Sequence, residues 1–355
     1  MKVGITYHEK FAQYDLGAGH PFRGDRFRNV LRLFEEQGLL RLPNVTVLSP
    51  EPISRDFLFK VHDEQYVDLI FRLAETHRPY DIETPASPEI LEAALSIVGG
   101  AVEAGKAIYE GRVGRAVALG CGYHHAGRNY GGGFCLFNDI AVLIEYLREM
   151  HGLKRVLILD YDVHFGNGTS DIYYADPEVL FISLHQDPRT IYPGTGFVEQ
   201  IGKGKGEGYN VNLPLPPRTG DATYLYALGE IFVPLAEEFK PELIVANGGS
   251  DPHFADELGS LGLTVNGFFN LSRTIVGAAE KACDGRLVLM PGSGYNPTIL
   301  PPCWYALTAG VVGLKTISVG DPVAPPVEPN WVRPTVKSTL KELKRLLKQY
   351  WRCFR

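Results

Sequence analysis

Two apolar stretches of the chain end in residues that are typical metal ligands. The run VLIL leads directly into DYDVH, which contains Asp160, Asp162 and His164. Alternate residues of an extended chain share one face, so these three side chains are expected on the same side. The run ELIVANGG leads in the same way to Asp251, and its two glycines let the backbone turn tightly. Each residue alone is more typical of a capped loop or a satisfied core histidine, but together two carboxylates and an imidazole favour a catalytic zinc site with one open coordination position.

A pair of adjacent histidines follows a third apolar run, AVALG. His124 and His125 stand in CGYHHAG, where a loop lets both rings face one site. Asp160 and Asn167 are the natural partners that orient the two rings. An aspartate raises the basicity of its imidazole, whereas an asparagine leaves its imidazole less basic, so the pair would supply both a base and an acid. The alternative is a loop with two solvent-facing histidines.

Two glycine-rich segments carry aromatic side chains of interest. Gly133 and Phe134 end the run GGGF, which lacks the spacing of phosphate-binding loops. The run instead favours a close approach of the backbone to a substrate, with Phe134 as one wall of a slot. Tyr295 lies in PGSGYNP after the run RLVLM, where a phenol would donate a hydrogen bond to the oxyanion of a tetrahedral intermediate. The alternative for Tyr295 is an ordinary turn tyrosine.

The elements that must position these residues alternate between strands and helices. Short runs rich in β-branched residues predict strands at Lys2–Thr6, Val45–Leu48, Arg115–Leu119, Arg155–Asp160, Val179–Leu184, Glu242–Asn247 and Arg286–Met290. Helical periodicity predicts helices at Asp25–Gln37, Pro88–Glu110, Asn138–His151, Ala222–Phe239 and Leu271–Lys281. We therefore expect an α/β fold with a parallel sheet covered by helices on both faces, and ligands bound outside the carboxyl ends of its strands.

Composition and charge narrow the class of protein. The chain has 355 residues, of which 45% are hydrophobic and 21% charged, as in an ordinary globular protein. Its net charge of −6 at pH 7 gives no bulk electrostatic basis for nucleic-acid binding. Residues 337–355 carry seven Lys or Arg and one Glu, which leaves the rest of the chain at −12. We predict one catalytic domain over 1–320, followed at 321–355 by a Pro-rich linker and a basic C-terminal helix.

The C-terminal segment has the pattern of an amphipathic helix. Its large apolar residues fall on one helical face, at Leu340, Leu343, Leu347, Tyr350 and Phe354. The simpler interpretation is a final helix that packs on the domain or on another subunit. A basic amphipathic anchor for a membrane or a nucleic acid is the alternative.

The cysteines and the lengths of the apolar runs indicate in which environment the protein is expected. The five cysteines form no C-x-x-C pair, which argues against a disulfide framework and favours a reducing, cytoplasmic environment. The N-terminal residues turn polar too early for a signal peptide, and no apolar run is long enough for a membrane span.

The motifs together resemble those of the zinc-dependent histone deacetylase superfamily, which includes acetylpolyamine amidohydrolases and acetoin-utilisation proteins. The matching motifs occur in family order: G-H-P at 19–21, Y-H-H-A at 123–126, G-G-G-F-C-L-F-N-D at 131–139, D-Y-D-V-H-F-G-N-G-T at 160–169, S-L-H at 183–185, Y-P-G-T-G at 192–196, G-S-D at 249–251 and G-S-G-Y-N at 292–296. The resemblance implies the arginase/deacetylase fold, a central, mostly parallel eight-stranded sheet flanked by helices on both faces.

The resemblance also implies roles for the candidate residues. A zinc ion, or iron in its place, is implied at Asp162, His164 and Asp251. A structural potassium or sodium ion is implied at Asp160, Ser183 and Leu184, with backbone oxygens of Asp162 and His164. The catalytic roles implied are proton transfer by His124 and His125, oriented by Asp160 and Asn167, and polarisation of the acyl carbonyl by Tyr295.

Further positions matched by the resemblance concern the substrate. Gly133, Phe134 and Tyr192 are implied to line an acyl-lysine tunnel, and Arg26 is implied to line an exit route for acetate. Two more positions bear on specificity. Glu83 stands near an acidic rim residue that is Asp in many relatives. Leu258 falls where polyamine deacetylases place a gatekeeping glutamate, which favours acyl-lysine, although the neighbouring Glu257 weakens this distinction.

The implied reaction is hydrolytic removal of an acetyl or other acyl group from an amine, with acetyl-lysine of proteins as the first expectation. One alternative is a deacetylase of small acetylated amines such as acetylpolyamines. Another is a catalytically silent protein that binds acyl-lysine. The sequence leaves open whether the chain forms a homo-oligomer.

Overall fold

A parallel sheet forms the centre of the protein, whose computed structural model describes all 355 residues. The sheet has eight strands in the order β2-β1-β3-β8-β7-β4-β5-β6, and the paired strands run parallel. Their bounds are β1 Val3–Thr6, β2 Val45–Leu48, β3 Arg115–Ala118, β4 Val156–Asp160, β5 Val179–Gln186, β6 Asn210–Leu215, β7 Leu243–Gly249 and β8 Leu287–Ser293. The predicted α/β fold with a mostly parallel sheet is confirmed.

Ten helices accompany the strands. Their bounds are α1 Asp25–Glu36, α2 Arg55–Leu58, α3 Glu64–Glu75, α4 Pro88–Tyr109, α5 Asp139–His151, α6 Asn167–Tyr173, α7 Asp221–Phe239, α8 Val265–Cys283, α9 Leu300–Val312 and α10 Val332–Leu347. The predicted helices correspond to α1, α4, α5, α7 and α8, but α8 begins six residues before its predicted start. Thr264 caps it by accepting a hydrogen bond from the backbone of Gly267, so the helix begins at a normal N-cap signal.

The chain divides into two compact units. The first contains residues 1–153, 167–172 and 288–292, and the second contains residues 154–166, 173–287 and 293–355. In the first unit α4 packs against α5 and β3. Helix α4 allows this contact because Gly105 faces α5, where an added Cβ would lie 2.4 Å from Leu143.

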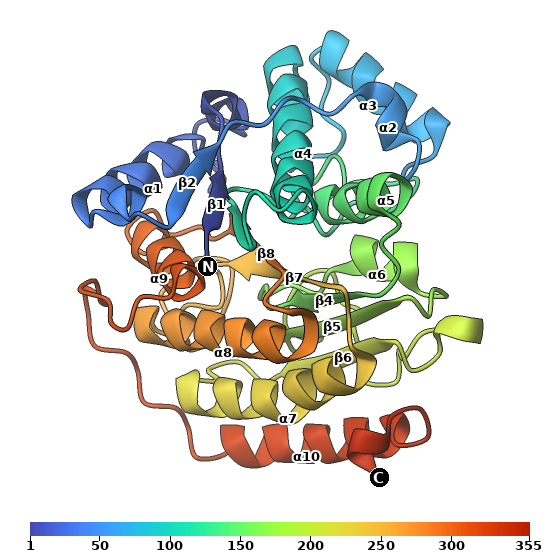
Figure 1. Cartoon of the computed structure of the whole chain (residues 1–355), viewed down its shortest axis with the longest axis vertical. Helices are drawn as coiled ribbons and strands as arrows, with labels where there is room; N and C mark the ends of the chain where they lie inside the picture. The colour runs from blue at the N-terminus through green and yellow to red at the C-terminus, as the bar shows by residue number, and fades with distance from the viewer. The chain divides into compact units, whose positions relative to one another are not determined.

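Helices of the second unit lie side by side in the order α8, α7, α10 (Figure 1). Helix α10 covers α7 and β6 with one apolar face, whose buried residues are Val332, Val336, Leu340, Leu343 and Leu347. Beyond the helix, Trp351 is buried and donates a hydrogen bond of 2.7 Å to the carbonyl of Gly208. Tyr350 and Phe354, which the periodicity also assigns to the apolar face, are only half-buried.

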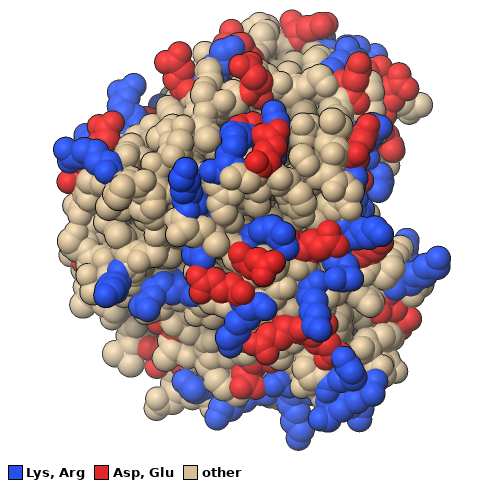
Figure 2. Space-filling model, in the orientation of Figure 1, with Lys and Arg blue, Asp and Glu red and all other residues tan.

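The opposite face of α10 is basic. Lys337, Lys341, Arg345 and Lys348 are exposed at intervals of three or four residues, and Figure 2 shows Lys and Arg side chains gathered over this helix. Two basic side chains near its end bind acids of α7: Lys344 pairs with Glu230, and Arg352 with Glu238. The helix is thus amphipathic, and its apolar face is covered by the same unit. None of the helices combines the length and the hydropathy needed to cross a bilayer.

Candidate active site

The three predicted metal ligands of the second unit lie together. Asp162 and His164 follow β4, Asp251 follows β7, and the ligand atoms of all three lie within 4.8 Å of one another. His164 Nδ1 is 3.2 Å from Asp162 Oδ1 and 3.4 Å from Asp251 Oδ2. All three residues are buried. The backbone that follows these two neighbouring parallel strands therefore brings two carboxylates and one imidazole to a single point.

The electrostatics of this cluster favour an added positive charge. Burial lowers the pKa of His164, but hydrogen bonds and charge from Asp162 and Asp251 outweigh burial and raise it to about 10. Burial and the neighbouring Asp162 raise the pKa of Asp251 to about 8. Two carboxylates held this close in a buried place attract either a proton or a cation. Asp251 Oδ2 is buried, and its 3.4 Å contact with His164 Nδ1 is long for a hydrogen bond, so this oxygen is suited to bind a metal ion.

Polar groups around the cluster fix its carboxylates. Ser293 Oγ donates to Asp251 Oδ1 at 2.8 Å, and the backbone of Val163 donates to the same oxygen at 3.4 Å. Asp160 Oδ1 accepts hydrogen bonds of 3.2 Å from the backbone of Asp162 and of 3.2 Å from Asn247 Nδ2. Ser293 and Asn247 thus hold the acids in the way that outer partners hold metal ligands.

The two glycines before Asp251 lie at the end of β7, where neighbouring protein atoms leave no room for a side chain. A Cβ at Gly248 would lie 2.5 Å from the ring of Tyr161, and one at Gly249 would lie 2.1 Å from the carbonyl oxygen of Ser293. Gly248 also has φ +152°, which side chains rarely adopt. Glycine is therefore required for β7 to end beside its neighbours and deliver Asp251.

The paired histidines lie in the first unit. His124 Nε2 and His125 Nε2 are 3.1 Å apart, and both residues are buried. His125 Nδ1 lies 2.7 Å from Asn167 Oδ1, so the predicted partnership with Asn167 is present. Gly133 touches the His125 ring, because a Cβ at Gly133 would lie 2.4 Å from His125 Cδ2. The loop that carries Phe134 is therefore packed directly against the second histidine.

The loop before the histidines is held by a buried carboxylate. Asp139, the first residue of α5, accepts hydrogen bonds from the backbone of Gly122 at 2.7 Å and of Tyr123 at 2.8 Å. Burial raises the pKa of Asp139 to about 6, although these hydrogen bonds act in the opposite direction. On the other side of the loop, His62 Nδ1 lies 2.7 Å from the carbonyl oxygen of Gly127.

Phe134 adopts a conformation that its surroundings must impose. Its φ of +69° lies in the left-handed region, which is costly for a residue with a side chain. Tyr14 Oη donates a hydrogen bond of 2.7 Å to the carbonyl of Phe134, and the His20 ring meets the Phe134 ring edge-on with centroids 4.6 Å apart. Burial lowers the pKa of His20, and the charge of nearby Glu83 partly opposes this shift. Phe134, His20 and Glu83 thus form one neighbourhood.

Arg26 is immobilised rather than free to sample solvent. Its guanidinium lies 3.7 Å from the centre of the Phe22 ring and donates to the carbonyls of Arg23, Pro21 and Gly292. Three backbone carbonyls and one aromatic ring therefore hold this buried cation in place.

Tyr295 and Leu258 share one anchor in the second unit. Asp256 accepts hydrogen bonds from the backbone of Tyr295 at 2.8 Å and of Leu258 at 3.0 Å. The Leu258 side chain is 38% exposed, whereas Tyr295 is buried. Burial raises the pKa of Asp256. The sequence gives no sign of this role for Asp256, because its partner Tyr295 lies 39 residues further along the chain, and sequence reasoning missed it.

Tyr192 lies near His164, and two of the residues predicted to hold a monovalent ion lie on β5. Tyr192 is 49% exposed, its ring centre is 6.5 Å from that of His164, and it precedes a cis proline. Ser183 and Leu184 lie on β5 and are fully buried. The Ser183 hydroxyl is 2.8 Å from His185 Nδ1, and the carbonyl of Leu184 accepts a hydrogen bond from Tyr224 at 3.3 Å.

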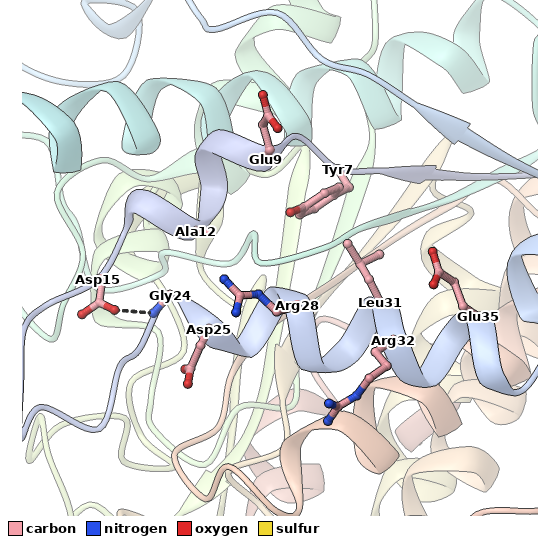
Figure 3. A pocket seen from close by; sticks show the side chains of 10 residues that line it. All are labelled: Tyr7, Glu9, Ala12, Asp15, Gly24, Asp25, Arg28, Leu31, Arg32 and Glu35. Atoms are coloured by element: carbon pink, nitrogen blue, oxygen red, sulfur yellow. Dashed lines mark hydrogen bonds between the residues drawn. The ribbon is translucent and has the colours of Figure 1, made fainter.

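A separate hollow of about 570 Å³ opens beside α1 in the first unit. Its lining mixes acids with bases: Asp25, Arg28, Arg32 and Glu35 come from α1, and Glu9 and Asp15 come from the segment before it (Figure 3). Asp15 is already used locally, since it accepts a hydrogen bond from the backbone of Gly24. The balance of charge favours no single class of ligand.

Comparison with known proteins gives this arrangement a family. A family model described as the histone deacetylase domain matches residues 20–311, most of the chain. The chain belongs to the histone deacetylase family. One relative, a "Probable deacetylase" of Archaeoglobus fulgidus, is 36% identical over 365 residues that cover 100% of both chains. A "Histone deacetylase-like amidohydrolase" of Pseudomonas aeruginosa is 34% identical over 88% of this chain and 82% of the relative.

Further similarities agree with this family. The acetoin utilization protein AcuC of Bacillus subtilis is 30% identical over 90% of this chain and 84% of its own length. Among solved structures, "Crystal Structure of HDA15 HD domain" has a TM-score of 0.86 and 26% sequence identity, and the match covers 99% of this chain and 97% of the other. The fold is therefore the arginase/deacetylase fold of the histone deacetylase family.

Proposed function

We propose that this member of the histone deacetylase family is a zinc-dependent amidohydrolase that removes acetyl or other acyl groups from acylated amines, with acetyl-lysine of proteins as its main substrate. The proposal is carried by the buried cluster of Asp162, His164 and Asp251, whose ligand atoms lie within 4.8 Å of one another. Two carboxylates and one imidazole form a donor set that catalytic zinc uses, with a position left for water or substrate. Iron in place of zinc is the alternative for the same donors.

A cation held there would lower the pKa of a water molecule and polarise the acyl oxygen. The chain's own residues would then move the protons. One or both of His124 and His125 would take a proton from the attacking water, and a histidine would return it to the leaving amine. The Tyr295 hydroxyl would donate a hydrogen bond to the oxyanion that develops on the acyl group. Water is consumed, and the products are acetate and the free amine.

The remaining residues would position the substrate and a structural ion. Phe134, Gly133 and Tyr192 would line the acyl-lysine tunnel, with Glu83 at its rim, and Arg26 would bind acetate on its way out. Potassium or sodium would bind near Asp160, Ser183 and Leu184. A protein substrate is favoured over a polyamine because Leu258 is neutral and partly exposed and so offers no charge to a substrate ammonium. The adjacent Glu257, also exposed, keeps small acetylated amines as the second candidate.

A substrate panel tests the proposal. Enzyme of measured metal content would be assayed with acetyl-lysine peptides, longer acyl-lysine peptides, acetylputrescine and acetylspermidine. We expect the highest kcat/KM on a lysine peptide, loss of turnover after chelation, and recovery with zinc. A higher kcat/KM on an acetylpolyamine would show that small acetylated amines, and not acetyl-lysine of proteins, are the main substrates. Tight hydroxamate binding with no turnover of any amide would instead indicate a silent acyl-lysine binding protein.

A further inference from the structure

The side-chain amide of Asn167 decides which nitrogen of His125 carries a proton. Asn167 Oδ1 lies 2.7 Å from His125 Nδ1, and Asn167 Nδ2 lies 3.3 Å from Tyr130 Oη. An amide has an accepting end and a donating end, and rotation by half a turn exchanges them. The orientation seen here makes His125 Nδ1 a donor, so His125 Nε2 is left as an acceptor. The reverse orientation would put the proton on Nε2 and remove the basic nitrogen from that position.

The orientation of the Asn167 amide is set by the carboxylate of Asp171, which is linked to the amide through the Tyr130 hydroxyl. Tyr130 Oη donates a hydrogen bond to Asp171 Oδ2. An ionised carboxylate accepts and does not donate, so the only proton of the Tyr130 hydroxyl is committed to Asp171. Tyr130 can then only accept from Asn167, and the amide must present its NH₂ to Tyr130 and its oxygen to His125. The direction of every hydrogen bond follows from Asp171.

The backbone is built to hold these groups in line. Asn167 and Asp171 are four residues apart on α6 and therefore share one face of the helix. Tyr130 reaches that face because Gly127 leaves room for its ring: a Cβ at Gly127 would lie 2.3 Å from Tyr130 Cε1. The backbone of Gly127 also donates to the Tyr130 carbonyl at 2.8 Å. Asp171 itself is exposed, so the ion at the end of this chain of contacts stays solvated.

We propose that Tyr130 and Asp171 are positioning residues that hold the Asn167 amide in one orientation, so that His125 keeps its proton on Nδ1 and offers Nε2 as the proton acceptor. With His125 Nε2 as an acceptor, the 3.1 Å contact between the Nε2 atoms of His124 and His125 requires His124 Nε2 to carry the shared proton. The catalytic consequence rests on the proposed function, whereas the protonation pattern can be observed without turnover.

The first test replaces the two residues outside the histidine pair. In Tyr130→Phe and in Asp171→Ala, the side-chain amide of Asn167 is no longer held in one orientation and can rotate by half a turn. In zinc-loaded protein labelled with ¹⁵N-histidine, we expect the Nδ1–H signature of the His125 ring to give way to a mixture of the two tautomers, with the ring assigned by comparison with His125→Ala. With an acetyl-lysine peptide, kcat should fall about tenfold and KM should change less than about twofold, since a misplaced base affects the chemical step.

A rescue and a matched control sharpen the test. A carboxylate accepts at both oxygens, so Asn167→Asp should restore the Nδ1–H tautomer in the Tyr130→Phe background and return kcat to within about threefold of wild type. Tyr146→Phe removes a half-buried phenol hydroxyl on α5, in the same unit but apart from Asn167. It should change neither the spectrum nor kcat.

Each outcome separates the inference from the proposed function. An unchanged His125 tautomer in Tyr130→Phe and Asp171→Ala overturns the inference, even where kcat falls. A changed tautomer with unchanged kcat overturns the positioning role. If the wild-type protein turned over no acylated amine, the proposed function would fail, and the ¹⁵N spectra alone would still decide whether Tyr130 and Asp171 orient Asn167.

Discussion

At the scale of single residues, neutral groups determine the positions and orientations of the side chains in the candidate site. Asp251 owes its position to the Ser293 hydroxyl and to a glycine pair that admits no side chain. His125 owes its orientation to an amide, and Phe134 to the phenol of Tyr14. A substitution that removes only an orienting group should therefore alter affinity or rate while the fold persists.

Tyr295→Phe tests the oxyanion donor. Loss of the hydroxyl should lower kcat by roughly 10²–10³, the usual effect of one such donor, because the hydrogen bond strengthens only as charge develops on the acyl oxygen. Steady-state kinetics on protein of equal metal content measure this effect. Tyr305→Phe, on α9, is the matched control. An unchanged rate in Tyr295→Phe would remove Tyr295 from the mechanism.

Ser293→Ala tests whether the Ser293 hydroxyl supports Asp251 as a proposed metal ligand. Without the hydroxyl, Asp251 Oδ1 loses its shortest hydrogen bond, and the affinity for zinc should fall roughly 10–100-fold. Competition with a chromophoric chelator measures this affinity. Ser272→Ala is the control, because its hydroxyl binds only the backbone of Phe269 within α8. Equal zinc affinity in wild type and Ser293→Ala would show that the hydrogen bond does not support metal binding.

The element scale shows what joins the histidine loop to its helix. His62 Nδ1 lies 2.7 Å from the carbonyl of Gly127 and therefore donates to it, while His62 Nε2 accepts from the backbone of Asn138 at 3.0 Å. One neutral imidazole thus links the loop that carries His124 and His125 to the start of α5. Burial lowers the pKa of His62 to about 4. A protonated ring could not accept from Asn138, so this link is sensitive to acid.

The low pKa of His62 predicts a pH dependence of stability. Between the ordinary histidine pKa and about 4, the unfolded chain binds the proton and the folded chain does not, so the free energy of unfolding falls as pH falls. From pH 7 to 5 this residue should cost about 2 kcal/mol. Urea unfolding of wild type and His62→Gln at both pH values measures the difference, which should shrink by that amount at pH 5. A constant difference would contradict the assignment.

Elements that the sequence did not predict have identifiable physical causes. Strand β6 reads NVNLPL, in which buried Asn210 and Asn212 interrupt the apolar pattern and Pro214 is tolerated because the strand lies at the sheet edge. Helix α9 begins with prolines at its first turn, where no backbone donor is needed, and these residues resemble a loop. The short α6 has too few residues for a helical period to show.

Some residues of the candidate site could be predicted from the sequence, and others could not. Asp162, His164, His125 and Tyr295 carry functional groups whose chemistry is visible in the residue type and the local spacing. The partners that orient them, such as Asp256 and Tyr130, are ordinary polar residues until the fold brings them within reach. Local sequence therefore predicts the candidate reacting groups, and only the three-dimensional arrangement identifies the residues that contact them.

At the scale of the whole molecule, the C-terminal segment completes the second unit. The sequence left open whether the amphipathic helix packs on the domain or serves as a basic anchor. In the structure its apolar face is buried against α7 and β6, so that face is not available to a membrane while the helix stays docked. The exposed Lys and Arg residues form the solvated side of a structural helix (Figure 2).

Paired substitutions on the two faces of α10 test this structural role. Leu343 is fully buried, so Leu343→Ala should lower the free energy of unfolding by about 2–5 kcal/mol through lost apolar contact and the cavity left behind. Lys341, two residues away, is exposed, and Lys341→Ala should change stability by less than about 0.5 kcal/mol. Urea unfolding followed by tryptophan fluorescence reports on the region directly, because Trp351 is buried beside Tyr209 and Phe239. Equal, small effects of both substitutions would mean that the helix is not docked in solution. Binding of anionic vesicles that Leu343→Ala weakens but Lys341→Ala does not would then make the apolar face a membrane contact instead.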